Sequence, residues 1–136
     1  MARPPRRFAA HFAPGSVRDL AGVRDGLAAH AFQLVDARPA PRFRGEAPEP
    51  RAWVKTGRIP GSRNVPSSEV VAEGRLKDAD ALRAAFAAGG VDLARPIVTS
   101  CGSGVNAATL SLALDVLGVG GDRALRRLVD GMGRAG

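Results

Sequence analysis

The chain has 136 residues, enough for one domain with a single core, and its formal charge of +7 comes almost entirely from arginine. The arginines are mixed with acidic residues, and with only five Phe and one Trp the composition argues against nucleic acid as a partner. One cysteine excludes an internal disulfide framework, and no apolar run approaches the roughly 20 residues that a membrane-spanning helix needs. We therefore expect a cytoplasmic domain that binds neither nucleic acid nor membrane and holds no metal or other cofactor.

The first part of the chain predicts an extended arm followed by a helix. Residues 1–15 are rich in proline and arginine without a period, so we expect the arm there, a domain over 16–131 and a tail over 132–136. Ser16 is the expected N-cap of a helix that ends near His30, because apolar residues recur at helical spacing between them.

A short apolar run at residues 32–35 predicts the first strand, which delivers Asp36 and Arg38 to its C-terminal end. An acid and an arginine in that position most often form a buried pair, so we expect a structural role for both. Residues 39–66 contain recurring prolines and no period, and a loop of this length in a compact domain is usually functional or disordered. Within it, Asn64-Val65 predicts a short second strand.

The second half of the chain alternates between helical and strand patterns. We expect a brief helix after Ser67 or Ser68, a helix over 78–88, a buried strand over 97–100, a helix over 107–117 and a last strand over 125–129. Short apolar strands that alternate with helices indicate an α/β fold with a parallel sheet flanked by helices on both faces.

Cys101 follows the predicted strand over 97–100 and precedes the loop Gly102-Ser103-Gly104-Val105-Asn106. Backbone N–H groups and the positive end of the next helix converge on the sulfur in this place, which favours a nucleophilic thiolate. The two glycines permit the backbone angles of a loop that curls around one atom. A small buried cysteine before a helix is the alternative, and the glycines and the strand-to-helix junction argue against it.

Four motifs in order resemble the rhodanese family over about residues 8–131, and within it the C-terminal catalytic domain of the 3-mercaptopyruvate sulfurtransferases. They are Leu34-Val35-Asp36-Ala37-Arg38, then Arg42-Phe43-Arg44-Gly45 leading to Pro48-Glu49-Pro50-Arg51, then Gly57-Arg58-Ile59-Pro60-Gly61-Ser62-Arg63-Asn64-Val65-Pro66, and Cys101-Gly102-Ser103-Gly104-Val105. The resemblance implies a rhodanese-like fold and sulfur transfer through a persulfide on the cysteine of the six-residue loop.

The resemblance also implies roles for individual residues. Cys101 corresponds to the nucleophile and Ser103 to the loop serine of a proton relay. Arg42 and Arg51 match the two arginines that hold the carboxylate and keto group of mercaptopyruvate. The alternative for both arginines is a surface ion pair with Glu46 or Glu49.

Several features depart from the family pattern. Asn106 stands where threonine is usual, Arg58 stands where histidine is common, and residues 129–133 replace a closing Tyr-Asp-Gly-Ser-Trp stretch. The full-length enzymes have two rhodanese domains, and the N-terminal one supplies an aspartate and a histidine to the relay. Residues 1–15 resemble the linker between the domains, so both a truncated product and a single-domain offshoot stay open. Self-association or a separate N-terminal rhodanese domain is then an expected partner.

Three functions are open for the Cys101 loop. A phosphatase loop needs an arginine at position 107, which is Ala107 here. The second possible function is that of a binding or sulfur-carrier module without activity. The third, which we predict, is that of a sulfurtransferase. Loops of thiosulfate-preferring rhodaneses typically carry cations, whereas Gly102, Ser103 and Asn106 are neutral, so we expect a donor such as 3-mercaptopyruvate. The expected acceptor is cyanide or a thiol such as thioredoxin.

Overall fold

The computed structural model describes residues 3–52, 54–119 and 124–125 of the chain. Four strands of this part form one parallel sheet in the order β2 (Arg63–Asn64), β1 (Gln33–Asp36), β5 (Ile97–Ser100) and β6 (Ala124–Leu125). The register pairs Val35 with Arg63 and Asp36 with Ser100. Every residue of β1 and β5 is buried, which explains why neither segment shows the alternation of a half-exposed strand.

Helix α1 (Leu20–Ala28) covers one face of the sheet. Its Val23 belongs to a small buried cluster with Phe32, Leu34 and Val98. This cluster joins the helix to the two central strands, because Leu34 lies in β1 and Val98 in β5.

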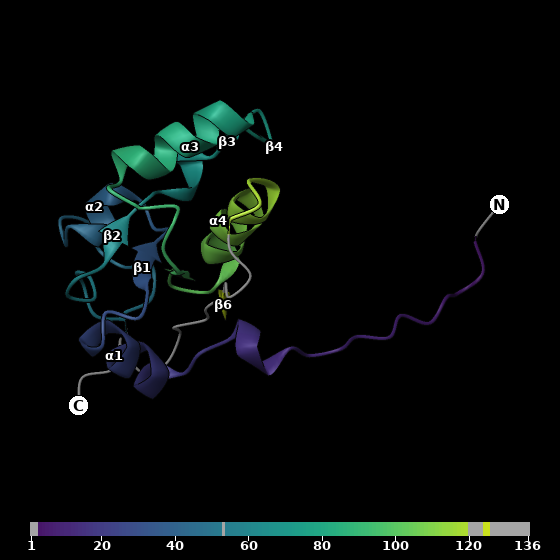
Figure 1. The fold of residues 1–136 in the computed structure, drawn as a ribbon, viewed down its shortest axis with the longest axis horizontal. Coiled ribbons are helices and arrows are strands. Elements are labelled where there is room, and N and C mark those ends of the chain that lie inside the picture. The colour runs from purple at the N-terminus through teal and green to yellow at the C-terminus, as the bar shows by residue number, and fades with distance from the viewer. Residues whose placement is uncertain (1–2, 53, 120–123, 126–136) are drawn as a thin grey trace.

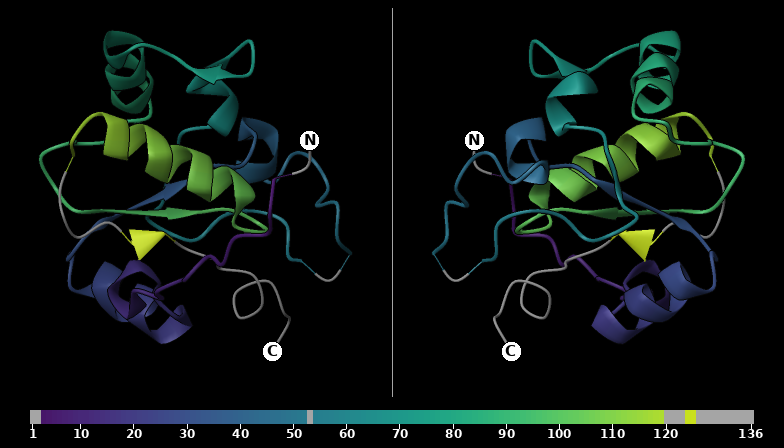
Figure 2. Two further views of the ribbon diagram at one scale, coloured as in Figure 1. Left: turned by 90° about the vertical axis from the view of Figure 1, so that its right-hand side faces the viewer. Right: turned by 90° about the vertical axis from the view of Figure 1, so that its left-hand side faces the viewer.

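Helices α3 (Ala79–Ala88) and α4 (Val105–Val116) lie on the opposite face, where the larger core cluster includes Phe86 and Leu110. Figure 2 shows α4 along one side of the sheet and α1 on the other. The prediction of a parallel sheet flanked by helices on both faces is therefore confirmed.

The first helix begins later than predicted. Asp19 is its N-cap, and the Asp19 carboxylate accepts a hydrogen bond of 2.7 Å from the Gly22 amide. Ser16 lies instead in a separate 3-10 turn, η1 (Pro14–Ser16), so the prediction of Ser16 as the N-cap is wrong. A carboxylate in this position is also favoured by the positive end of the helix dipole.

The sequence does not predict three of the small elements. Helix α2 (Ala40–Phe43) lies inside the segment that was expected to be irregular. Strands β3 (Val71–Ala72) and β4 (Arg75–Leu76) form an antiparallel hairpin after the short 3-10 helix η2 (Ser67–Glu69). Elements of two to four residues are too short to display a hydrophobic period.

The N-terminal arm contrasts with the compact centre of the described chain. Residues 3–13 carry no helix or strand and run away from the sheet, as Figure 1 shows, with Phe8 and Phe12 exposed. The expected last strand begins one residue earlier, at Ala124, while residues 126–129 and the expected tail over 132–136 lie outside the described residues. None of the described helices is both long and apolar enough to cross a bilayer.

The packing of α1 against Phe32 predicts that Gly26 tolerates no side chain. A Cβ at Gly26 would lie 2.1 Å from Cε1 of Phe32, so Gly26→Ala should lower the free energy of unfolding by about 1–3 kcal/mol. Thermal and urea unfolding measure this change. Gly15→Ala is the control, since its Cβ would meet nothing within 4 Å, and equal stability of the two variants would contradict the packing argument.

Candidate active site

Cys101 lies directly after β5, at the C-terminal edge of the sheet. The loop that follows turns into α4, which begins at Val105 rather than at the predicted Ala107. Gly104 has a φ of +92°, a left-handed conformation that glycine adopts without a steric penalty. The turn directs the Gly104 amide at the cysteine, where it donates a hydrogen bond of 2.9 Å to Sγ of Cys101.

Polar contacts between β5 and α4 hold this loop in place. Oγ1 of Thr99 donates to the carbonyl of Ala107 at 3.1 Å and lies 2.9 Å from the hydroxyl oxygen of Ser111. Because Thr99 is two residues before Cys101, these bonds fix the first turns of α4 relative to the sulfur. Cys101 itself is buried, with 7% of its surface exposed.

Two acids and two arginines form a chain of ion pairs that begins at the end of β1. Arg38 binds Asp36 at 2.7 Å and Oε1 of Glu49 at 2.6 Å, and Oε2 of Glu49 binds Arg42 at 2.5 Å. The side chains of Asp36, Arg38 and Glu49 are at most 9% exposed, and that of Arg42 is 20% exposed. The expected Asp36–Arg38 pair is therefore one part of a longer buried network.

The same network anchors the segment between α2 and β2, whose described residues contain neither a helix nor a strand. Nη2 of Arg38 also donates to the carbonyl of Gly57 at 2.6 Å. Nδ2 of Asn64 donates to the carbonyls of Asp36 and Arg38 at 3.0 and 2.9 Å. Side chains at the strand ends thus supply the hydrogen bonds that regular structure would otherwise provide.

Burial and pairing act in opposite directions on the charges of the network. Burial alone would raise the pKa of Glu49, but its bonds to Arg42 and Arg38 outweigh that effect and hold the pKa below its ordinary value. Burial alone would lower the pKa of Arg38, and Asp36 and Glu49 hold it above its ordinary value. Both groups are therefore charged at neutral pH.

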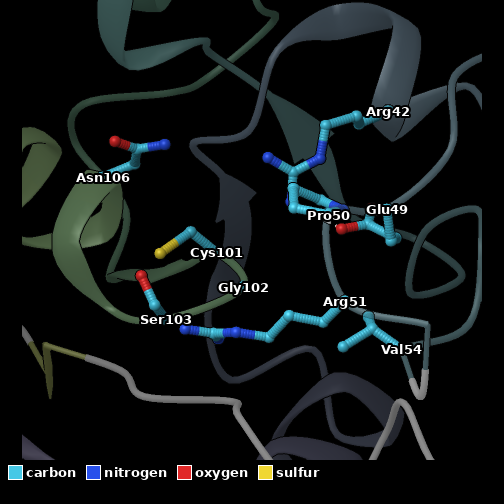
Figure 3. Close-up of a pocket in the computed structure, with 9 residues that line it drawn as sticks. All are labelled: Arg42, Glu49, Pro50, Arg51, Val54, Cys101, Gly102, Ser103 and Asn106. Atoms are coloured by element: carbon cyan, nitrogen blue, oxygen red, sulfur yellow. Dashed lines mark hydrogen bonds and ion pairs between the residues drawn. The ribbon is translucent and has the colours of Figure 1, made fainter.

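A pocket of about 160 Å³ lies between the cysteine loop and the charged network. Its described lining residues are Arg42, Glu49, Pro50, Arg51, Val54, Cys101, Gly102, Ser103 and Asn106. Figure 3 shows the side chain of Arg51 extending toward Ser103, while the guanidinium of Arg42 points toward the side where Cys101 lies. A buried sulfur, the backbone amide of Gly104 and two arginines so arranged can receive a small anion and react with it.

The predicted site residues fall into two groups in the structure. Six of them line the pocket, namely Cys101, Gly102, Ser103, Asn106, Arg42 and Arg51. Gly104 is the N-cap of α4 and Val105 is its first residue, so the predicted loop ends at Gly104, and neither residue is among the described lining of the pocket. Asp36 and Arg38 continue the ion-pair network beyond Glu49. Arg58 stacks on the ring of Phe43 at 5.0 Å, and residues 129–133 lie outside the described residues.

Sequence reasoning missed Glu49 as a site residue. It names Glu49 only as a surface partner of an arginine, whereas the structure buries Glu49 between two arginines at the pocket. Arg42 does pair with Glu49, as the alternative for this arginine had it, but the pair is buried rather than on the surface. An exposed pair forms nearby, between Arg44 and Glu46 at 2.9 Å. The available signal was Pro48-Glu49-Pro50-Arg51, where two prolines stiffen the backbone on either side of the acid.

Metal-binding residues do not gather in the described part of the chain, where no three of His, Cys, Asp and Glu come together at a spacing that could hold an ion.

Comparison with known proteins relates the whole domain to one family. Residues 19–132 match the family model of the rhodanese-like domain. The 3-mercaptopyruvate sulfurtransferase of Escherichia coli (strain K12) is 46% identical over 116 residues, which are 85% of this chain and 41% of that protein. The mitochondrial thiosulfate/3-mercaptopyruvate sulfurtransferase 1 of Arabidopsis thaliana is 36% identical over 115 residues, 84% of this chain and 30% of that protein.

A solved structure gives the same relation. The crystal structure of SseA from Escherichia coli, described as a 3-mercaptopyruvate sulfotransferase with the rhodanese fold, superposes with a TM-score of 0.74 at 42% identity. The match covers 92% of this chain and 45% of that one. This chain thus spans less than half the length of these relatives.

The lowered pKa of Glu49 predicts how stability responds to acid. Because the folded state holds Glu49 ionised, its ion pairs stabilise the fold fully above the ordinary glutamate pKa of about 4.3 and are lost as the pH falls through the lower folded-state value. Urea unfolding between about pH 6 and about pH 3 should show a steeper loss of stability for the wild type than for Glu49→Gln. Glu46→Gln, which removes an exposed pair, should follow the wild type, and equal slopes for wild type and Glu49→Gln would refute the argument.

Proposed function

This chain belongs to the rhodanese-like domain family, and from that premise we propose that it is a sulfurtransferase that carries sulfur as a persulfide on Cys101. The observation that carries the proposal is the 2.9 Å hydrogen bond from the Gly104 amide to Sγ of Cys101, at a pocket that two arginines also line. A donated hydrogen bond stabilises negative charge on Sγ in the thiolate, the form in which the cysteine attacks the donor and leaves the persulfide. The proposed donor is 3-mercaptopyruvate, with thiosulfate as a second donor.

The first step of the proposed reaction loads the cysteine. The thiolate of Cys101 attacks the sulfur of mercaptopyruvate, so that a sulfur–sulfur bond forms and the carbon–sulfur bond of the donor breaks. The electron pair of the broken bond leaves on carbon as the enolate of pyruvate, which takes up the proton that the donor thiol gives away. Atoms and electrons balance without an external oxidant.

The second step unloads the cysteine. A thiolate or cyanide attacks the outer sulfur of the persulfide, the sulfur–sulfur bond breaks, and Cys101 leaves as a thiolate. We propose a thiol such as that of thioredoxin as the acceptor, in a reducing compartment such as the cytoplasm, because a lone reactive cysteine stays reduced there.

The arginines are proposed to orient the donor. The donor carboxylate would lie on Arg42 and its keto oxygen near Arg51, since both residues line the pocket beside Cys101. Nε of Arg42 is buried and has no hydrogen-bond partner among the described residues, and a donor oxygen would supply one.

Ser103 is proposed to pass the donor's thiol proton onward, because it lines the pocket beside the sulfur. Neither histidine of the chain belongs to the described pocket lining, with His11 in the arm and His30 just after α1. We therefore propose that further relay groups come from a second rhodanese domain or from a second copy of this chain.

A binding or sulfur-carrier module without activity is the second candidate. The exposed Val105, Leu112 and Val116 on α4 favour it, since they form an apolar strip beside the cysteine loop that another protein could cover. The two candidates differ in whether Cys101 accepts sulfur from a small donor.

Replacement of the nucleophile tests the proposed function. Wild-type protein incubated with mercaptopyruvate or thiosulfate should gain one sulfur atom in intact mass spectrometry, and dithiothreitol should remove it. Cys101→Ser should gain none, because a hydroxyl is a poor nucleophile toward sulfur at neutral pH and leaves the persulfide unformed. If the wild-type protein keeps its original mass with both donors, the proposed sulfurtransferase activity is refuted and the binding module is the remaining candidate.

Replacement of Arg42 tests its contact with the donor carboxylate. Arg42→Lys keeps the positive charge and removes the planar fork, so kcat/KM for mercaptopyruvate should fall by about 10- to 100-fold. The value for thiosulfate, which has no carboxylate, should change by less than about threefold. Equal losses with both donors would show that the substitution disturbs the pocket as a whole.

A further inference from the structure

Glu49 is the carboxylate among the described residues that line the pocket. Its two oxygens bind different arginines, Oε1 the guanidinium of Arg38 and Oε2 that of Arg42. Only 3% of its side chain is exposed. A negative charge is therefore built into a small pocket that otherwise has the character of an anion site.

The geometry excludes the usual catalytic roles of a carboxylate for Glu49. Both oxygens already accept hydrogen bonds from guanidinium groups, and these pairs keep the group ionised at neutral pH. A general base works best with a pKa near the working pH, whereas the bonds to Arg42 and Arg38 hold the pKa of Glu49 below its ordinary value. Its effect on a ligand is therefore electrostatic.

The charge of Glu49 offsets the charge of Arg42 at the place where a donor binds. Charges a few ångström apart in a partly buried site are weakly screened, so each unit of pocket charge acts twice as strongly on a dianion as on a monoanion. Mercaptopyruvate carries one carboxylate charge, whereas thiosulfate carries two negative charges. We propose that Glu49 is a specificity-determining residue that sets the preference of this pocket for singly over doubly charged sulfur donors. This inference rests on the proposed sulfurtransferase function.

The neighbouring acids do not share this position. Asp36 lies behind Arg38, and Glu46 forms an exposed pair with Arg44 and is not among the described lining residues. Glu46 therefore offers a matched control, since Glu46→Gln removes the same charge from the same segment outside the pocket.

Two nearly isosteric substitutions change the pocket charge in opposite directions. Glu49→Gln raises it by one unit, and Asn106→Asp lowers it by one unit on the other wall of the pocket. The quantity to measure is the ratio of kcat/KM for thiosulfate to kcat/KM for mercaptopyruvate. We expect Glu49→Gln to raise this ratio by about tenfold or more, Asn106→Asp to lower it by about fivefold or more, and Glu46→Gln to leave it within about twofold.

Equilibrium binding separates this inference from the proposed function. Calorimetry of Cys101→Ser with pyruvate and with sulfate measures the preference for one or two charges without any turnover. Combining Cys101→Ser with Glu49→Gln should shift binding toward sulfate, and combining it with Asn106→Asp should shift binding toward pyruvate. Unchanged preferences in both the binding and the kinetic ratios would overturn the role of Glu49. If the double variants show the expected shifts in binding but the wild type forms no persulfide with either donor, only the proposed sulfur-transfer reaction is overturned.

Discussion

The chain of ion pairs from Asp36 through Arg38 and Glu49 to Arg42 is the interaction on which the rest of the site depends. Each largely buried charge has an opposite charge beside it, so attraction between neighbouring charges offsets the free-energy cost of removing these groups from water. Loss of one partner from such a pair typically costs about 3–5 kcal/mol, because its neighbour is left buried and unpaired. The ion-pair network also fixes the position of the irregular segment between α2 and β2.

The two halves of the site meet because β1 and β5 are neighbours in a parallel sheet. The register places Asp36 opposite Ser100, so the charged network starts one strand away from Cys101 at the same edge. Parallel strands bring both C-terminal ends to this edge, which is where open α/β sheets bind their ligands. The sulfur and one backbone amide come from the loop after β5, and the charged network extends from the end of β1 to Glu49 and Arg42.

Pattern and length decide which parts of this structure the sequence predicts. β5 and α3 lie where expected, because a short run of apolar and β-branched residues indicates a buried strand and a capped amphipathic helix repeats a recognisable period. Ser16 and Asp19 are equally good caps by residue type, so only the course of the chain decides between them. The two prolines around Glu49 indicate a stiff segment, but they do not show whether the acid faces water or two arginines. Only the tertiary structure reveals that Glu49 is buried.

Under the proposed function, the sulfur and the charges that a donor would meet come from different segments of the chain. The Cys101 sulfur is held by a backbone amide, which substitutions of distant side chains leave in place. The charges that a donor meets come from the segment between α2 and β2, which is fixed by side-chain bonds rather than by regular structure. A single substitution in that segment can therefore change the charge of the pocket while the nucleophile keeps its geometry. Under the proposed function, the segment that would select the donor and the loop that would carry out the chemistry are therefore distinct parts of the chain, and both line the same pocket.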